Sequence, residues 1–548
     1  MVLSNAARRC GGLLGSLLAG LLVLALPPAP VRGAELLQIR LDGLLLPLDL
    51  RELEAWSRDP AHPQGDLGAW LDLLAPSRRT GLLRLLRAPL VHDDSMTSQL
   101  LESWAGQRLL ASAGGLLSTD HGQAGPELYR ALHGLLRQQR EVTGLQLLRA
   151  LPSRSITVNL DALLSLAAQW QRQLEAQRQS LVALRRLPLP VRTPRLPLTD
   201  GLILARRPGG AGGLGLAPAA APAQELLLPV PHRTQPLRLQ LWQAPASRGG
   251  APWLLLSPGL GGSGRQLEWL AAALRERGWS VLLLEHPGSD ELAMRAWLEG
   301  RRPPPAAETV NDRLRDLQAV VAAVAAGPLP RLGPSVVLVG HSLGAVSSLM
   351  ATGLRPEPGL QRRCDRALDG LPLANLSRLL QCQLPYVALP PPHPLAQPVA
   401  GVVSLNGFGS LLWPERGLQQ LRAPVLLMGG SLDLITPPLS EQVRLFVPPG
   451  HARSRLVLLE GGSHFSPVRI SAGHQALFQL GEELVGVDPD RMQAMILSLT
   501  SEFLQSLEPA AAGAVPLQRR RLGGVTAYVL DRPLTLEWLS TLSLPTAN

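Results

Sequence analysis

Residues 335–344 contain the feature that most constrains how this chain can fold. A short apolar, β-branched run leads directly into Gly340-His341-Ser342-Leu343-Gly344, and helical character follows from residue 345. Strand, sharp turn and helix are the setting in which a G-x-S-x-G motif exposes a nucleophilic serine. The turn needs glycine at both ends because the serine backbone is strained and neighbouring segments pass close. The motif alone is weak, so an ordinary serine in a strand-to-helix turn is the alternative that its context must exclude.

Composition narrows the classes of protein to which the chain can belong. It has 548 residues, 46% of them hydrophobic, which is enough for a large core and for two or more domains. The formal net charge is +10, but the basic residues are scattered and only 3% of residues are aromatic, which leaves little for base stacking. We therefore expect a solvated basic surface and no nucleic-acid partner. Contact with anionic head groups at a membrane surface is the alternative.

The first 34 residues have the pattern of a cleaved signal peptide. Two arginines precede the apolar segment 13–26, prolines end it, and small residues near Gly33 offer a cleavage site. The apolar segment is short for a bilayer span, so we expect export to the periplasm or beyond, with an uncleaved membrane anchor as the alternative. Cleavage would leave Cys364 and Cys382, which an exported protein can pair as a disulfide, the alternative being two free thiols.

Patterning along the rest of the chain predicts two domains. Residues 35–187 are mostly helical in pattern, and residues 188–507 alternate strands with helices, as in a mostly parallel sheet covered on both faces. Within the second domain we expect a flexible linker at 207–224 and an insertion rich in Leu and Pro at 354–398. Residues 508–548 are assigned to a C-terminal extension. Strands are expected at 237–242, 253–257, 280–285, 335–339, 402–405, 425–429 and 455–459, and helices near 265–277, 311–326, 345–353, 439–446 and 488–507.

A serine is a poor nucleophile unless a base accepts its proton and a third group orients that base. Asp433 lies just beyond the strand expected at 425–429, and His464 lies just beyond the next one. Parallel strands end at one edge of a sheet, so Ser342, Asp433 and His464 should meet there. Each residue also has an ordinary interpretation, because Asp433 can cap the following turn and His464 can be a polar loop residue.

Further residues remain as alternatives for these roles. Asp290 and Glu415 are substitute acids, and His286 and His341 are less suitable bases, since His341 lies inside the turn and should point away from the serine oxygen. The oxyanion of an acyl-transfer intermediate needs two preorganised N–H donors. We expect the backbone N–H groups of Leu343, next to the nucleophile, and of Leu260, in the glycine-rich loop after residue 257.

The same loop supports a competing interpretation. Residues 259–264 read G-x-G-x-x-G after a strand and before a helix, and Glu285 ends the next strand, which is the layout of a dinucleotide-binding unit. An oxidoreductase would explain this loop but would leave Ser342, Asp433 and His464 as coincidences. Protection by NAD against unfolding, compared with labelling by a fluorophosphonate, distinguishes the two.

These motifs together resemble the α/β-hydrolase family, within it the platelet-activating-factor acetylhydrolase-like and dienelactone-hydrolase-like branch. The resemblance rests on 258–262, 340–344, 430–433 and 461–465, and loosely on 285–288. The whole chain is similar to cyanobacterial exported hydrolases with an N-terminal helical domain of unknown function, through 151–156 and 375–382. Two departures concern Pro258, where many hydrolases have His, and the acid, which in acetylhydrolase relatives can follow an earlier strand, where this chain has Asn406 and Glu415.

The sequence therefore predicts an α/β-hydrolase that cleaves carboxylic esters through Ser342, His464 and Asp433 without a cofactor. Leucines of the insertion, at 368, 371, 373, 376, 379 and 380, indicate an apolar cap and hence lipid or other acyl esters, although they also suit plain core packing. An acyltransferase would use the same triad with an alcohol acceptor. A third interpretation is an interaction protein whose helical domain captures a partner.

Overall fold

A computed structural model describes residues 34–542 with gaps at 73–74, 88, 93–102, 137, 139–140, 194–203, 207–213, 217–222, 245–249, 369–374, 392, 470–488 and 509–512. The predicted signal peptide, apart from Ala34, and most of the predicted linker 207–224 lie outside the described residues. The chain divides into a smaller unit, Met1–Leu101 with Gln107–Leu164, and a larger unit, Glu102–Gly106 with Ser165–Asn548. This division falls inside one helix, α9 (Leu160–Arg186), rather than after residue 187.

The smaller unit contains more sheet than the helical pattern predicted. A five-stranded sheet has the order β2-β1-β7-β4-β5, and its core includes Leu50, Trp56 and Ile156. A strand-like run at 37–41 is the one strand expected here, and it forms β1. Strands β4 and β5 are only three and two residues long, too short for alternating hydrophobicity to reveal. The elements before α9 are β1 (Leu36–Leu41), β2 (Leu44–Asp49), α2 (Leu50–Arg58), α3 (Leu67–Asp72), α4 (Pro76–Arg87), β3 (Pro89–His92), α6 (Trp104–Leu116), β4 (Leu117–Thr119), β5 (Gly122–Gln123), α7 (Gly125–Leu136), β6 (Glu141–Thr143), α8 (Gly144–Ala150) and β7 (Ser155–Asn159).

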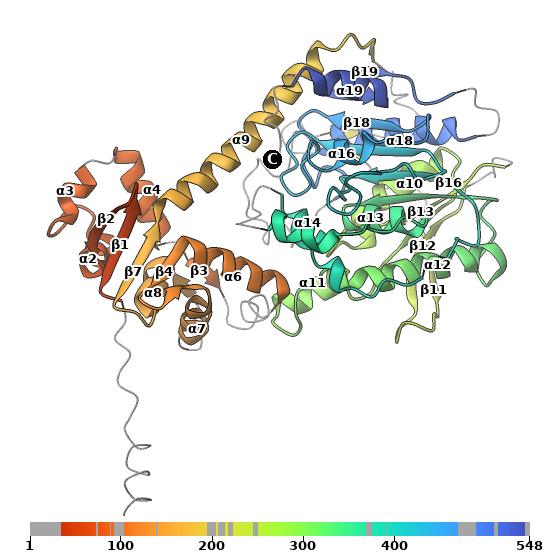
Figure 1. The fold of residues 1–548 in the computed structure, drawn as a ribbon. Coiled ribbons are helices and arrows are strands. Elements are labelled where there is room, and N and C mark those ends of the chain that lie inside the picture. Colours follow the sequence, from red (N-terminus) through yellow and green to blue (C-terminus); the bar gives the residue numbers. More distant parts are fainter. Residues whose placement is uncertain are drawn as a thin grey trace, which may run out of the picture. The chain divides into compact units, whose positions relative to one another are not determined.

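An eleven-stranded sheet forms the centre of the larger unit (Figure 1). Its order is β11-β12-β14-β13-β15-β16-β17-β18-β20-β19-β8, and the six strands from β14 to β18 are mutually parallel. The strands are β8 (Val191–Arg192), β11 (Gln224–Leu228), β12 (Leu237–Trp242), β13 (Trp253–Ser257), β14 (Val281–Leu284), β15 (Val336–His341), β16 (Val399–Leu405), β17 (Val425–Gly430), β18 (Arg455–Leu459), β19 (Gln518–Leu522) and β20 (Val525–Leu530). A separate pair consists of β9 (Leu204–Arg206) and β10 (Leu214–Leu216).

Helices cover both faces of this sheet, as the alternation of strands and helices predicted. Successive residues of each central strand point to opposite faces, so Leu338 joins one core and Val339 the other. One face packs against α10 (Glu268–Glu276) and α18 (Pro489–Ser506). The opposite face packs against α12 (Val310–Ala326), α13 (Leu343–Ala351) and α16 (Gln442–Phe446).

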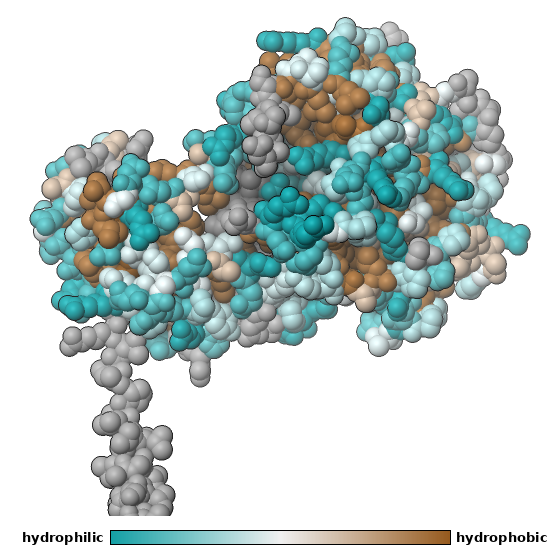
Figure 2. Space-filling model, in the orientation of Figure 1, coloured by the Kyte–Doolittle hydropathy of each residue, from teal (hydrophilic) through white to brown (hydrophobic). Residues whose placement is uncertain are grey.

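The C-terminal residues belong to the sheet and are not an extension outside it. Strand β20 pairs with β18, and α19 (Arg532–Ser540) follows it. Trp538 of α19 is fully buried and donates from Nε1 to the carbonyl oxygen of Ser180 on α9, at 3.0 Å. Figure 2 shows apolar residues gathered over α19, where Leu536 stays 38% exposed.

The insertion at 354–398 packs on the larger unit through α14 (Leu360–Ala367) and α15 (Ser377–Gln381). Cys364 and Cys382 form a disulfide across a Cα–Cα distance of 5.3 Å. The buried Glu441 carboxylate accepts hydrogen bonds from the side chains of Asn375 and Gln381 in the insertion. It also accepts the backbone N–H groups of residues 409 and 410, so it joins the insertion to the loop after β16. Leu371 and Leu373 of the predicted cap lie outside the described residues. In the described part of the chain, no helix is long and apolar enough to cross a bilayer.

Candidate active site

The G-x-S-x-G segment forms a strained turn at the carboxyl end of β15. Ser342 has φ 52° and ψ −119°, a conformation that non-glycine residues rarely adopt. A Cβ on Gly344 would lie 2.2 Å from the Ser257 carbonyl oxygen, and one on Gly340 would lie 2.3 Å from the Gly344 backbone. Only glycine fits at these two positions. The strain is therefore fixed by close packing on both sides of the serine.

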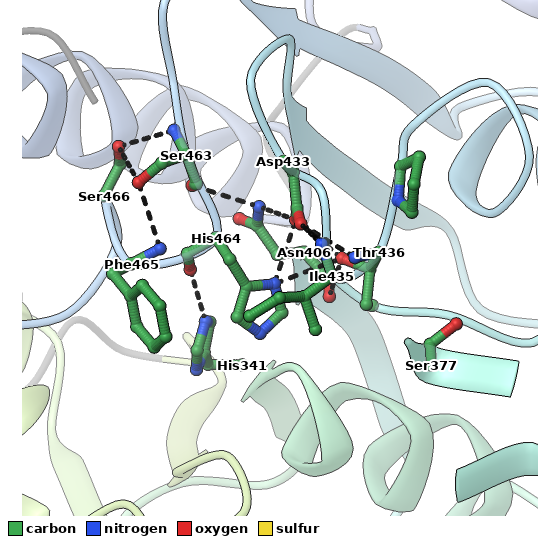
Figure 3. Close-up of polar contacts among 12 residues, drawn as sticks. His341, Ser377, Asn406, Asp433, Ile435, Thr436, Ser463, His464, Phe465 and Ser466 are labelled. Carbon is green, nitrogen blue, oxygen red and sulfur yellow. Dashed lines mark hydrogen bonds and ion pairs between the residues drawn. The ribbon is translucent and has the colours of Figure 1, made fainter. Parts of the chain in front are cut away.

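Asp433 lies beyond β17, and both oxygens of its carboxylate accept hydrogen bonds from surrounding N–H and O–H groups (Figure 3). Oδ1 accepts the backbone N–H groups of Ile435 and Thr436 at 2.9 and 2.7 Å. Oδ2 accepts the Asn406 amide at 2.5 Å, the Thr436 hydroxyl at 2.6 Å and the His464 ring at 2.9 Å. Burial alone would raise the pKa of Asp433, but the His464 charge and these hydrogen bonds lower it to about 2. The carboxylate is thus ionised at neutral pH, although it is fully buried.

His464, beyond β18, is oriented by this carboxylate. Its Nδ1 lies 2.9 Å from Asp433 Oδ2, so Nδ1 carries the proton and Nε2 is left with a free lone pair. Among the described residues no hydrogen bond joins the Ser342 hydroxyl to this ring. Hydrogen bonds between a nucleophile and its base are often long before substrate binds and tighten during the reaction.

His341, inside the turn, contacts His464 rather than the serine oxygen. Its Nε2–H donates to the His464 carbonyl at 2.9 Å, and the two ring centroids are 5.0 Å apart. Burial, and then the charge of His464, lower the pKa of His341 to about 3. His341 is therefore neutral near pH 7 and acts as a hydrogen-bond donor that fixes the backbone of the His464 loop.

Changing His341 to Phe should lower kcat/KM for an ester by about 3–10-fold, the ordinary worth of one hydrogen bond. His341→Gln keeps an N–H donor and should recover part of the loss. Steady-state kinetics on both variants, with their melting temperatures, measures this. Equal loss in the two variants would show that ring packing, and not the hydrogen bond, positions His464.

Both predicted oxyanion donors belong to segments that adjoin Ser342. Leu343 N–H begins α13, and Leu260 N–H lies in the loop after β13, where a Cβ on Gly259 would be 3.2 Å from the Ser342 Cβ. Within the described residues neither N–H donates to a protein acceptor. Both backbone donors are therefore available to a developing oxyanion close to Ser342.

A second chain of Ser, His and Asp side chains lies deeper in the larger unit. Ser257 Oγ is 2.8 Å from His286 Nε2, and His286 Nδ1 is 2.9 Å from Asp316 Oδ2. All three side chains are buried, Ser257 lies within regular β13, and Asp316 is paired with Arg233. Burial lowers the pKa of His286 to about 4. This chain has the connectivity of a triad, but Ser257 is fully buried and lies in regular strand, whereas Ser342 lies in a strained turn and is 7% exposed.

The substitute residues have other contacts. Asp290 caps α11 (Glu291–Leu298) by accepting the Ala293 N–H at 2.9 Å. The carboxylate of Glu285, the acid of the dinucleotide interpretation, accepts the Gly264 N–H of the glycine-rich loop at 3.2 Å, and burial raises its pKa. No three His, Cys, Asp or Glu side chains in the described ranges gather as a metal site.

Two residues of the site were not predicted in their observed roles. Asn406 follows β16 in the left-handed region, φ 49°, and was considered only as a place where relatives can have an acid. Here it donates to the acid of the next strand instead. Thr436 holds the same carboxylate through both its N–H and its hydroxyl. The strand-end position of Asn406 was the available signal, and the signal for Thr436 was the expected capping of the turn after Asp433, which its N–H forms.

Two family models match parts of this chain. Residues 254–475 match the model described as alpha/beta hydrolase family, and residues 33–159 match that described as alpha/beta hydrolase of unknown function (DUF1400). One similar solved structure is a ferulic acid esterase from Streptomyces cinnamoneus, with 20% identity and a TM-score of 0.38, covering 56% of this chain and 98% of that one. No curated protein matches. Neither family model separates the predicted acetylhydrolase-like branch from other α/β-hydrolases. The larger unit therefore has the α/β-hydrolase fold, and residues 254–475 match the alpha/beta hydrolase family.

Proposed function

We propose that this chain is a serine esterase that cleaves carboxylic esters through Ser342, His464 and Asp433. The observation that carries the proposal is the strained Ser342 at the end of β15, together with the His464–Asp433 pair at the same edge of the sheet. The strain presents a hydroxyl at the sheet edge, and the ionised carboxylate leaves the imidazole free to accept a proton.

The reaction follows from these positions. Ser342 Oγ attacks the ester carbonyl as its proton passes to His464 Nε2, and the negative oxygen is bound by the N–H groups of Leu260 and Leu343. His464 then returns the proton to the departing alcohol, which leaves an acyl group on Ser342. Water, deprotonated by His464, hydrolyses this acyl-enzyme. Asp433 keeps the imidazole tautomer and stabilises the imidazolium throughout.

Apolar side chains beside these loops favour an acyl or lipid ester over a small polar one. Leu432, one residue before the acid, is 41% exposed, and Leu376, at the start of α15, is 39% exposed. The next residue, Ser377, donates from its N–H to the Ile435 carbonyl at 3.0 Å, so this end of the insertion adjoins the acid loop. Met294 of α11 packs directly against Gly261 of the loop that holds Leu260. An acyl chain that reached either loop would contact apolar side chains.

Export to an oxidising compartment is part of the same proposal. It is supported by the disulfide between Cys364 and Cys382, since such bonds persist mainly outside the reducing cytosol.

Labelling by a fluorophosphonate, combined with hydrolysis of p-nitrophenyl esters of graded acyl length, tests the proposal. We expect the probe to attach to Ser342, as located by peptide mass spectrometry, and turnover to rise from acetate to medium-length acyl chains. Formation of an alkyl ester when an alcohol is added would assign the acyl group to an alcohol acceptor and so favour the acyltransferase alternative. No labelling and no turnover by folded protein would remove the esterase assignment.

A further inference from the structure

Arg313, on α12, reaches the loop that holds the predicted oxyanion donor. Its guanidinium donates to the Pro258 carbonyl at 2.8 Å and to the Gly259 carbonyl at 2.9 Å, while Nε donates to the Ser289 hydroxyl at 2.8 Å. The Ser289 carbonyl in turn accepts the Gly261 N–H at 2.8 Å. The loop is thus held from two directions by one side chain and the residue that it binds.

The charge of Arg313 is unusual for its surroundings. The residue is 1% exposed, and in the described part of the chain its guanidinium forms no ion pair, since its hydrogen bonds go to carbonyl and hydroxyl oxygens. Burial lowers the pKa of Arg313 to about 9, so it is still a cation near pH 7. The nearby Asp316 and Asp290 carboxylates offset part of this lowering of the pKa without forming a direct ion pair. A buried charge without a directly bound carboxylate costs folding free energy, and an apolar side chain would suffice if Arg313 only packed α12 against its neighbours.

The geometry of one peptide bond links Arg313 to the reaction. A trans peptide is planar, and its C=O and N–H point in opposite directions. The peptide between Gly259 and Leu260 directs its carbonyl at Arg313, so the Leu260 N–H points away from Arg313. Gly259 itself lies against Ser342, since an added Cβ would be 3.2 Å from the serine Cβ.

We propose that Arg313 is a positioning residue that fixes the Leu260 N–H as an oxyanion donor and adds positive potential beneath it. A charged donor on the carbonyl polarises the peptide and strengthens its N–H as a donor. The guanidinium binds the carbonyl end of the same peptide, so its positive charge also favours a negative oxygen at the N–H end. The proposal rests on the esterase function above, because it requires an oxyanion at Ser342.

The experiment compares Arg313→Gln with a matched control, Arg233→Gln. Arg233 is also largely buried and belongs to the same polar cluster, but it binds Asp316, Asp312 and the Pro287 carbonyl rather than the oxyanion loop. We expect Arg313→Gln to lower kcat by about 10–100-fold with KM changed less than about threefold, since loss of a full oxyanion donor costs about 10²–10³-fold. Arg233→Gln should lower the melting temperature yet keep kcat within about threefold of wild type.

Inhibitor binding separates positioning from general damage. An alkyl trifluoromethyl ketone adds to Ser342 to give a tetrahedral alkoxide, so its Ki should rise in Arg313→Gln by the same factor as kcat/KM falls. Arg313→Lys keeps the positive charge but cannot donate to the Pro258 and Gly259 carbonyls in the same bidentate geometry, so it should recover only part of the activity. If Arg313→Gln does not fold, Arg313→Lys alone decides, with a loss of about 3–10-fold expected.

Three results would overturn the inference about Arg313 alone. In the first, Arg313→Gln folds and turns over ester as fast as Arg233→Gln. In the second, the Ki of the trifluoromethyl ketone for Arg313→Gln equals that for the wild type. The third, where only the lysine variant folds, is wild-type turnover by that variant. A wild-type protein that a fluorophosphonate does not label at Ser342 would remove the proposed function itself, and the role of Arg313 with it. Normal labelling with an unaffected Arg313→Gln would remove the role of Arg313 alone.

Discussion

Replacing Ser342 with alanine should abolish ester hydrolysis, with kcat falling by about 10⁴-fold or more while the fold is kept. Loss of a catalytic serine removes the whole acyl-enzyme route, and what remains comes from binding and the oxyanion donors. The small side chain should be tolerated, because Ser342 makes its backbone contact through N–H to the Leu405 carbonyl at 2.9 Å. Stopped assays at high enzyme concentration, together with the melting temperature, measure both quantities.

The matched control is Ser257→Ala. Ser257 is the serine of the buried Ser257–His286–Asp316 chain, so its loss should leave His286 without one partner and lower stability modestly. Its kcat should stay within about tenfold of wild type, an allowance for altered packing beside the oxyanion loop. The reverse pattern, an active Ser342→Ala and an inactive but folded Ser257→Ala, would transfer the nucleophile to the buried chain.

The second large effect is expected for Asp433→Asn, with kcat lower by about 10³–10⁴-fold. An asparagine NH₂ at this position would face the His464 ring and the Asn406 amide, which are both donors to the native carboxylate. His464 would then carry its proton on Nε2 and could not accept one from the serine. Kinetics near pH 8 and a fluorophosphonate labelling rate that falls in parallel would support this reason.

The acid stability of the same variant gives an independent readout. The folded pKa of Asp433, about 2, lies below its ordinary value of 3.8, so the carboxylate stabilises the fold above about pH 4. That contribution is lost as pH falls from about 4 to 2. The free energy of unfolding in urea should therefore fall more steeply over this pH range for the wild type than for Asp433→Asn. Parallel curves would show that the carboxylate is not held as the structure places it.

Much of the larger unit could be predicted because its buried parallel strands are short apolar runs. Two of these strands, β13 and β18, have the bounds expected from the sequence. So does β12, which is antiparallel to its neighbours and alternates apolar with polar residues. Strand β19 could not be found in this way because it contains consecutive arginines. The Arg520 side chain is buried there through its ion pair with Glu502 of α18, a tertiary contact that hydrophobic patterning does not detect.

The candidate site shows the same division between local and tertiary information. Ser342, Asp433 and His464 could be selected because each follows a predicted strand, and parallel strands end together. Arg313 lies in the first turn of α12, 55 residues from Pro258, and is one of many scattered arginines. Its part in the site depends on how α12 packs beneath the loop, which no local pattern records.

Helix α9 limits where a recombinant fragment of the larger unit can begin. From Ser165 onward it belongs to the larger unit, and Gln177 on it donates to the Asp433 carbonyl at 3.4 Å. A recombinant fragment beginning at residue 188 would lack this helix, expose Trp538 and remove the hydrogen bond to the backbone of Asp433, the proposed catalytic acid. Fragment design for crystallisation or directed evolution of the larger unit must therefore retain residues 165–187.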